Sequence, residues 1–130
     1  MKKQFEKFLK SAWGLEIYSQ EKVVFRSKKP GVKGLLDFIK KHKRHYKNLI
    51  IFDKKVGRGV ALFAAYLKAS EVYGKTGSKL AAKVLRECKI KFYFSKTIPY
   101  ILNKQGNGLC PIEKLSIDKT PEKFYNCLVR

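Results

Sequence analysis

The fold is decided by the stretch Leu49-Ile50-Ile51-Phe52-Asp53-Lys54-Lys55-Val56-Gly57-Arg58. Its first four residues form a continuous apolar run, which is typical of a strand covered on both faces. From about Val56 to Lys68 the chain is rich in apolar residues, and this pattern indicates a helix packed against a sheet. The acid, the bases and the glycines between the two are then expected at a strand-to-helix junction. Open α/β folds tend to hold their ligands at such junctions.

Hydrophobic spacing on either side of this stretch predicts helices and strands in alternation. The predicted elements, in chain order, are a helix in the first dozen residues, strands at 15–19 and 23–26 joined as a hairpin, a helix from 32 into a basic cluster, the strand at 49–52, the helix at 56–68, a strand at 71–74, a helix at 79–88, a strand at 90–94, and short helices at 111–115 and after 120. Alternation from residue 48 onward predicts βαβ units with right-handed crossovers. We therefore expect an α/β fold, a three-layer α/β/α sandwich with a mixed sheet of about five strands, in a single domain over residues 1–130.

Side-chain chemistry at three positions supports the predicted helix boundaries. Ser78 is suited to the N-cap of the helix at 79–88, because its hydroxyl can accept a bond from a free N–H group of the first turn. Thr120 is suited to the same position of the last helix, and Pro121 to the first helical residue.

The composition indicates the cellular location of the protein and whether disulfides or a structural zinc ion are expected. No apolar run approaches the roughly 20 residues of a membrane helix, and the first residues lack the apolar core of a signal peptide. We therefore expect a cytoplasmic protein that does not contact a membrane. The three cysteines, Cys88, Cys110 and Cys127, lack the paired spacing of a zinc knuckle or a redox motif. A disulfide framework and a structural zinc site are not expected.

The net charge of +20 is the strongest compositional feature. Lysine and arginine bind phosphates, so the charge is consistent with a nucleic-acid partner. However, nearly all the positive residues are lysines scattered over every predicted element, which favours a generally basic, solvated surface. The densest cluster, Lys40–Lys47, is interpreted as a helix end and turn where cations complement the helix dipole.

A set of short motifs, together with the element order, resembles the cytidine-deaminase-like fold. The motifs are Asp53-Lys54, Val56-Gly57 with the Ala-rich helix after it, Pro99-Tyr100-Ile101-Leu102-Asn103, Gly106, Gly108 and Cys110-Pro111-Ile112-Glu113. The stretch from Asp53 to Glu113 is similar to an uncharacterised prokaryotic family, a domain of unknown function assigned to that superfamily.

The resemblance implies a member without the zinc of the deaminases. A zinc-dependent deaminase places a His or Cys with a catalytic Glu after the hairpin, and a PCxxC pair at the next helix start. The matching positions here are 30–33 and 53–57, and neither contains Cys or His. A catalytic zinc normally needs three protein ligands, and His42 and His45 lie at the wrong end of their helix to supply them. We therefore expect no metal and no other cofactor.

The resemblance also implies a pocket for an anion, because the two helix starts converge in this fold and their free N–H groups point into one place. We expect it to bind a nucleotide-like or other anionic small molecule. Lys28, Lys29, Lys33, Lys54 and Arg58 would surround it with positive charge, and glycines would allow close approach of the backbone. The predicted ligand-binding residues are Gly31, Lys33, Gly57, Arg58, Asn103, Gly106, Gly108 and Glu113.

Three residues are candidates for chemistry in this pocket. Cys110 precedes Pro111 as the cap of a short helix, where a thiol can become a nucleophile; the alternative is a small buried residue that closes a loop. Lys54 is a candidate base with Asp53 as its orienting group. The alternatives are that Asp53 caps the following helix and that Lys54 is simply solvated.

Two other kinds of function stay open at this stage. One is a basic RNA-binding module with a vestigial pocket, and the other is a structural or regulatory subunit that dimerises through an exposed sheet edge. Whether the protein is an enzyme is likewise open, although zinc-dependent deamination is not expected.

Overall fold

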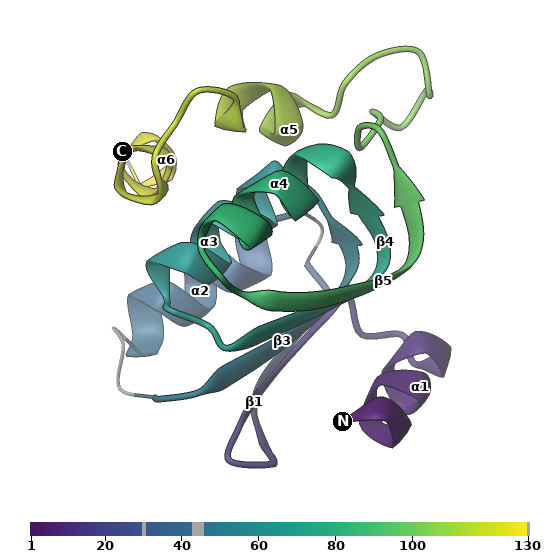
Figure 1. The fold of residues 1–130 in the computed structure, drawn as a ribbon, viewed down its shortest axis with the longest axis vertical. Helices are drawn as coiled ribbons and strands as arrows, with labels where there is room; N and C mark the ends of the chain where they lie inside the picture. The colour runs from purple at the N-terminus through teal and green to yellow at the C-terminus, as the bar shows by residue number, and fades with distance from the viewer. Residues whose placement is uncertain (30, 43–45, 130) are drawn as a thin grey trace.

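The computed structural model of the protein describes residues 1–29, 31–42 and 46–129 (Figure 1). Its elements are α1 (Lys2–Lys10), β1 (Leu15–Ser19), β2 (Lys22–Ser27), α2 (Lys33–His42), β3 (Leu49–Val56), α3 (Arg58–Tyr66), β4 (Glu71–Ser78), α4 (Lys79–Glu87), β5 (Lys91–Ile98), α5 (Pro111–Ser116) and α6 (Pro121–Leu128). Each predicted element is present, in the predicted order. None of the helices in the described ranges combines the length and the apolar character that crossing a bilayer requires.

The five strands form one mixed sheet in the order β2-β1-β3-β4-β5. The β1–β2 hairpin and the β1–β3 pair are antiparallel, whereas β3, β4 and β5 run parallel. The predicted mixed sheet of about five strands is therefore confirmed. Because β3 is the central strand, its last residues lie between β1 and β4, and Asp53 is opposite both Leu15 and Gly74.

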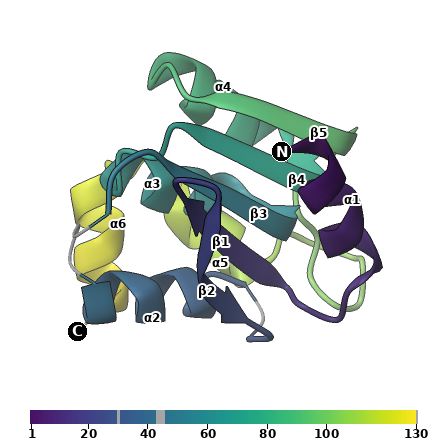
Figure 2. The same cartoon turned by 90° about the horizontal axis from the view of Figure 1, so that it is seen from below.

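Helices lie on both faces of the sheet, with α1 on one face and α2, α3 and α4 on the other (Figures 1 and 2). On the α1 face, Phe5 and Phe8 pack with Tyr18 and Phe52 in an aromatic cluster. The larger core lies beneath α2, α3 and α4, and Phe124 of α6 is also buried in it against Phe63. Burial on both faces explains the apolar run at the start of β3, and every residue of β1 is buried as well.

The structure corrects the predicted end of the central strand. β3 continues through Asp53 to Val56, which pairs with Gly77 of β4, and α3 begins only at Arg58 after the N-cap Gly57. Asp53 therefore lies inside a strand, and the suggestion that it caps the following helix is wrong. The polar residues 53–55 resemble a loop in the sequence, but their backbone is held by the ladders on either side. β4 and β5 are also longer than predicted, because the parallel pairing between them continues to Ser78 and Ile98.

The predicted caps are confirmed where the structure describes them. The Ser78 hydroxyl accepts the N–H of Ala81 at 3.0 Å, and the Thr120 hydroxyl accepts the N–H of Lys123 at 3.2 Å. The predicted basic helix end is confirmed in part, since α2 ends with Lys40, Lys41 and His42. The remainder of that prediction, at residues 43–45, falls outside the described residues, as does residue 30 of the segment matched to the deaminase zinc site.

Candidate functional site

A pocket of about 550 Å³ opens at the carboxyl end of β3. Five of the residues that line it are lysines, so we call it the lysine pocket. It is built from the start of the hairpin, the segment before α2, the end of β3 and the loop between β5 and α5. Its lining residues are Gly14, Lys28, Lys29, Gly31, Asp53, Lys54, Lys55, Ile101, Leu102, Asn103, Lys104, Gln105, Cys110 and Pro111.

The three predicted catalytic residues, Asp53, Lys54 and Cys110, all line this pocket, although they come from segments far apart in the sequence. Two predicted ligand-binding residues, Gly31 and Asn103, line it as well. The parallel order of β3, β4 and β5 brings these segments together, because it places the loop after β5 at the same edge of the sheet as the end of β3.

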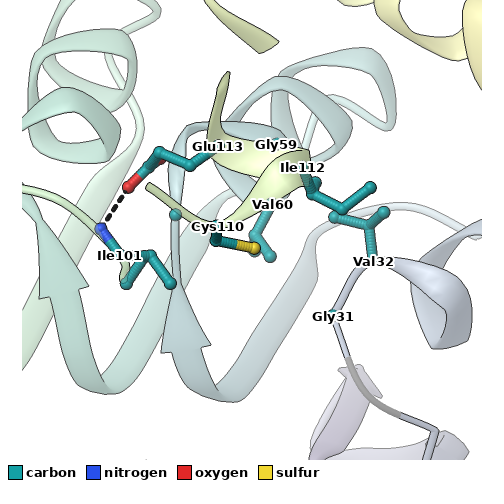
Figure 3. Close-up of a pocket in the computed structure, with 9 residues that line it drawn as sticks. Gly31, Val32, Gly59, Val60, Ile101, Cys110, Ile112 and Glu113 are labelled. Carbon is teal, nitrogen blue, oxygen red and sulfur yellow. Dashed lines mark hydrogen bonds between the residues drawn. The ribbon is translucent and has the colours of Figure 1, made fainter. Parts of the chain in front are cut away.

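A much smaller cavity, of about 40 Å³, lies between the starts of α2 and α3. In Figure 3 the Cys110 side chain points toward Val60, among the apolar side chains of this cavity. A Cβ atom on Gly59 would come within 3.0 Å of the Ile112 side chain, so α5 packs closely on the start of α3. The converging helix starts are thus covered by α5, and the space left between them is too small for a nucleotide.

Glu113 has a structural role that the sequence did not indicate. It is only 2% exposed, and its Oε1 atom accepts the N–H of Arg58 at 2.6 Å. Its Oε2 atom accepts the N–H of Ile101 at 2.5 Å, the bond drawn in Figure 3. Both oxygens are therefore engaged with backbone groups, and the carboxylate itself occupies the anion position at the start of α3. The prediction that Glu113 contacts a ligand is not supported, because another part of the chain uses it.

Three further predicted ligand-binding residues lie outside the lysine pocket. The Arg58 guanidinium donates to the carbonyls of Ser116 and Lys119, so it ties α3 to the segment after α5. Gly57 lines the small cavity instead, where a Cβ atom would lie 3.0 Å from Glu113 Oε1. Lys33 is exposed as the first residue of α2 and lines neither space. Each of the three residues is close to the helix starts, as predicted, but α5 covers those starts and leaves no space there for a ligand of nucleotide size.

The glycines of the loop shape it without lining the pocket. Gly106 has a φ of +74°, a conformation that favours glycine, and its N–H donates to the carbonyl of Asn103 at 3.0 Å. The Gly108 carbonyl accepts the N–H of Asn103 at 2.9 Å, and the Asn103 amide donates to Asn107 Oδ1 at 3.0 Å. The loop is therefore a closed turn that presents Asn103 to the pocket, while Gly106 and Gly108 act on its shape.

Asp53 is 6% exposed, and burial raises its pKa to about 8. Its Oδ1 atom accepts the N–H of Lys55 at 3.0 Å, which favours the ionised form but does not outweigh burial. At neutral pH the side chain is therefore mainly a neutral acid that can donate a hydrogen bond. It adds little negative charge to the lysine pocket.

Lys54 is not oriented by Asp53. Neighbouring residues of a strand point to opposite faces, and the Lys54 ammonium reaches the α1 side, where it donates to the carbonyl of Ser11 at 2.7 Å. It also lies 4.8 Å from the centre of the Phe8 ring. Burial lowers its pKa, and the nearby Lys75 lowers it further. The proposed pair of Lys54 and Asp53 is thus wrong in its geometry, although both residues border the pocket.

Lys55 and Lys104 line the pocket but were not singled out in the sequence. Lys55 directly follows the acid-lysine motif, and Lys104 follows Asn103, so adjacency to the motifs was the available signal. Gly14 carries no comparable signal. It reaches the pocket because its carbonyl accepts the N–H of Lys54 at 3.1 Å.

Comparison with known proteins identifies the family. A family model described as TM1506, a domain of unknown function (DUF1893), matches residues 4–129. The chain belongs to the DUF1893 family. The crystal structure of a DUF1893 family protein (TM1506) from Thermotoga maritima is 29% identical to this chain and superposes with a TM-score of 0.85, covering 98% of this chain and 86% of that one. None of the curated proteins compared with the chain matches it. Membership in a family of unknown function, as the motifs suggested, is confirmed.

In the described ranges of this DUF1893 domain, no three His, Cys, Asp or Glu side chains come together in a group that could hold a metal ion. Cys110 and Glu113 are neighbours at the small cavity, but both Glu113 oxygens already accept backbone N–H groups. The other residues between the helix starts are glycines and apolar side chains.

We predict that Cys110 is alkylated by iodoacetamide several-fold more slowly than Cys88 and Cys127 in the folded domain. Cys88 and Cys127 are exposed, whereas Cys110 is partly buried and points into the apolar cavity. Access limits the reaction of a thiol along with its ionisation. Peptide mass spectrometry after timed alkylation measures the three rates. Faster modification of Cys110 would contradict the prediction and would indicate an activated thiol.

Proposed function

We propose that this DUF1893 domain binds a nucleotide-like or other anionic small molecule in the lysine pocket. The observation that carries the proposal is the positive charge of the pocket lining. Among the described residues, the lining contains five lysines and one acid, Asp53, which is mainly neutral at neutral pH because burial raises its pKa. Lys29 is paired with Asp37 at 2.5 Å, and the Lys54 ammonium is bound to the Ser11 carbonyl. The ammonium groups available to a ligand are therefore mainly those of Lys28, Lys55 and Lys104. The volume of about 550 Å³ lies within the range of small-molecule sites.

The proposed site is displaced from the one expected at the helix starts. The start of α3 already receives the Glu113 carboxylate, and the adjacent cavity of about 40 Å³ is too small for a nucleotide. The lysine pocket lies next to it and shares Gly31, Ile101 and Cys110 with it. A ligand there would meet ammonium groups and the Asn103 turn, with the Asp53 acid as a hydrogen-bond donor.

We also propose that the fold is cytidine-deaminase-like and that the zinc centre of the deaminases has been replaced. The element order supports this relation, as does the meeting of the two helix starts after β2 and β3. The residues at that meeting point do not fit a zinc ion, because they supply one thiol and a carboxylate whose oxygens are occupied. We therefore derive no reaction step through a metal.

Cys110 is the residue best placed for thiol-dependent chemistry, because it borders both the lysine pocket and the small cavity. Lys54 is less suited to act as a base, since its ammonium is bound to the Ser11 carbonyl on the α1 side. A cytoplasmic location stays a prediction from the sequence.

Thermal-shift measurements against nucleotides, nucleosides and phosphosugars test the proposed site. A ligand that binds only the folded state stabilises it by about 2.7 kcal/mol at a concentration of 100 Kd. We expect phosphate-bearing compounds to raise the Tm and the corresponding nucleosides to have little effect. The double variant Lys55→Gln/Lys104→Gln should abolish the shift.

The matched control is the double variant Lys83→Gln/Lys89→Gln, which removes two exposed lysines from α4 and the turn after it. It should retain the shift. A shift that survives in the pocket variant, or that is lost equally in both variants, would contradict the proposed site. Absence of a shift with every phosphate compound would also count against it.

A further inference from the structure

A second large pocket lies on the face of the sheet that α1 covers, between α1 and the edge strand β5. Its volume is about 530 Å³. In Figure 2, α1 lies beside β4 and β5. We call this pocket the α1–β5 groove. It is lined by Lys2, Phe5, Glu6, Leu9, Tyr73, Tyr93 and Ser95.

Tyr93 presents an exposed aromatic ring to this groove. Its side chain is 54% exposed, although the ring packs edge-on against Phe5 with 6.1 Å between ring centres. Tyr73 lies 6.4 Å from Tyr93 and 5.3 Å from Phe5. Phe5 is itself buried against Phe52, so the two tyrosines rest on a fixed aromatic cluster. The result is a supported ring with a surface open to solvent.

Lysines are frequent on the elements that form the groove, and Lys2 lines it together with the acid Glu6. α1 carries four, at positions 2, 3, 7 and 10, against the single acid Glu6. Strand alternation places Lys91 on the same face as Tyr93, and Lys75 on the same face as Tyr73. Lys75 is close enough to Lys54 to lower its pKa, which agrees with that placement. The other described acids on this face are Glu71, which accepts the Tyr73 hydroxyl at 2.9 Å, and Glu16, which is paired with Arg26 at 2.7 Å.

We propose that the α1–β5 groove binds single-stranded nucleic acid, with one base stacked on Tyr93 and phosphates held by Lys2 and Lys91. Proteins that bind single strands combine exposed aromatic rings with a positive groove along the backbone of the strand. An unstacked base can reach such a ring, whereas a base inside a duplex cannot. The site is independent of the lysine pocket and of the function proposed for it.

A second copy of the chain is a less suitable occupant. Two chains would each carry a net charge of +20, and the β5 edge contains Lys91 and Lys96. Lysines on an edge strand oppose pairing with another strand, and like charges repel across an interface. A polyanion is attracted by the same lysines and does not need to pair with the edge strand.

Fluorescence anisotropy with labelled oligo-U RNA and oligo-dT DNA of about 12 nucleotides tests the proposal on the full chain. Tyr93→Ala is expected to weaken binding by roughly fivefold or more, since it removes a stacking surface, whereas Tyr93→Phe should bind like the parent. Lys91→Gln should reduce the slope of log K against log salt by about 0.7, the value for one phosphate contact on a single strand. The RNA and DNA arms show which of the two strands binds more tightly, and binding of either supports the proposal if Tyr93→Ala weakens it.

Two variants serve as matched controls. Tyr100→Ala removes a tyrosine that is 49% exposed outside the groove, and Lys83→Gln removes an exposed lysine from α4. Tyr100→Ala should leave the affinity unchanged, and Lys83→Gln should alter it less than Lys91→Gln does. Melting curves confirm that each variant is folded. Equal affinities of Tyr93→Ala and the parent would overturn the proposal, and so would absence of binding to both oligonucleotides. A dimer in light scattering that Tyr93→Ala dissociates would likewise overturn it, in favour of an interface between copies.

Discussion

Replacing Glu113 with alanine is expected to lower the free energy of unfolding by about 3–5 kcal/mol. The carboxylate is buried and accepts the N–H of Arg58 at 2.6 Å and the N–H of Ile101 at 2.5 Å. Hydrogen bonds to a charged group contribute about 1.5–3 kcal/mol each, and alanine leaves both donors without a partner. The substitution also detaches α5 from the start of α3. Urea unfolding followed by circular dichroism measures the change.

Two companion variants make the Glu113 result specific. Glu113→Gln retains one acceptor oxygen but turns an NH₂ group toward the other N–H, so its loss should lie between those of the parent and the alanine variant. Glu87→Ala, at the exposed end of α4, should change the free energy of unfolding by no more than about 0.5 kcal/mol. A loss below about 1 kcal/mol for Glu113→Ala would show that the carboxylate does not hold these segments together.

Replacing Asp53 with asparagine is expected to stabilise the protein at pH 8 by about 3–5 kcal/mol. Burial raises the pKa of Asp53 from 3.8 to about 8, so between these values the folded state holds a proton that the unfolded state has released. The contribution of Asp53 to stability is therefore fully present below pH 4 and is lost as the pH rises toward 8. Asparagine is neutral at every pH and can still accept the N–H of Lys55.

The test compares the free energy of unfolding of the two proteins from pH 5 to pH 8. The parent should lose stability as the pH rises, and Asp53→Asn should show a much flatter dependence. Asp37 provides the control, because its pairing with Lys29 lowers its pKa. The contribution of Asp37 to stability is therefore lost only as the pH decreases below about 4, which is outside the range tested. Parallel pH profiles for the parent and Asp53→Asn would refute the assignment of a raised pKa to Asp53.

Much of the architecture was predictable because it depends on local chemistry. Ser78 and Thr120 each accept an N–H group three residues away, so their cap positions follow from the adjacent sequence. The apolar spacing of α1 and α4 likewise identified these helices. Cys110 was correctly placed at the N-cap of a short helix that begins with Pro111.

The errors concern residues whose surroundings come from distant segments. Asp53 was placed at a junction because three polar residues follow the apolar run, yet Leu15 and Gly74 pair with it on either side. The sequence likewise does not show that Arg58 and Ile101 present their N–H groups to Glu113, a residue predicted to contact a ligand. Nor does it show that α5 covers the helix starts, where the anion pocket was expected.

The order and type of the elements, the caps, the positive charge and the candidate residues could all be predicted from the sequence, since each depends on side-chain chemistry or on short-range periodicity. The packing of the chain shows in addition that Glu113 closes the start of α3, that burial raises the pKa of Asp53, and that five lysines line one pocket. The physical reason is that burial, hydrogen-bond partners and local charge density are set by the segments that pack around a residue. In this chain those segments can be far away in the sequence, as in the bond from Arg58 to Glu113, which joins residues 55 positions apart.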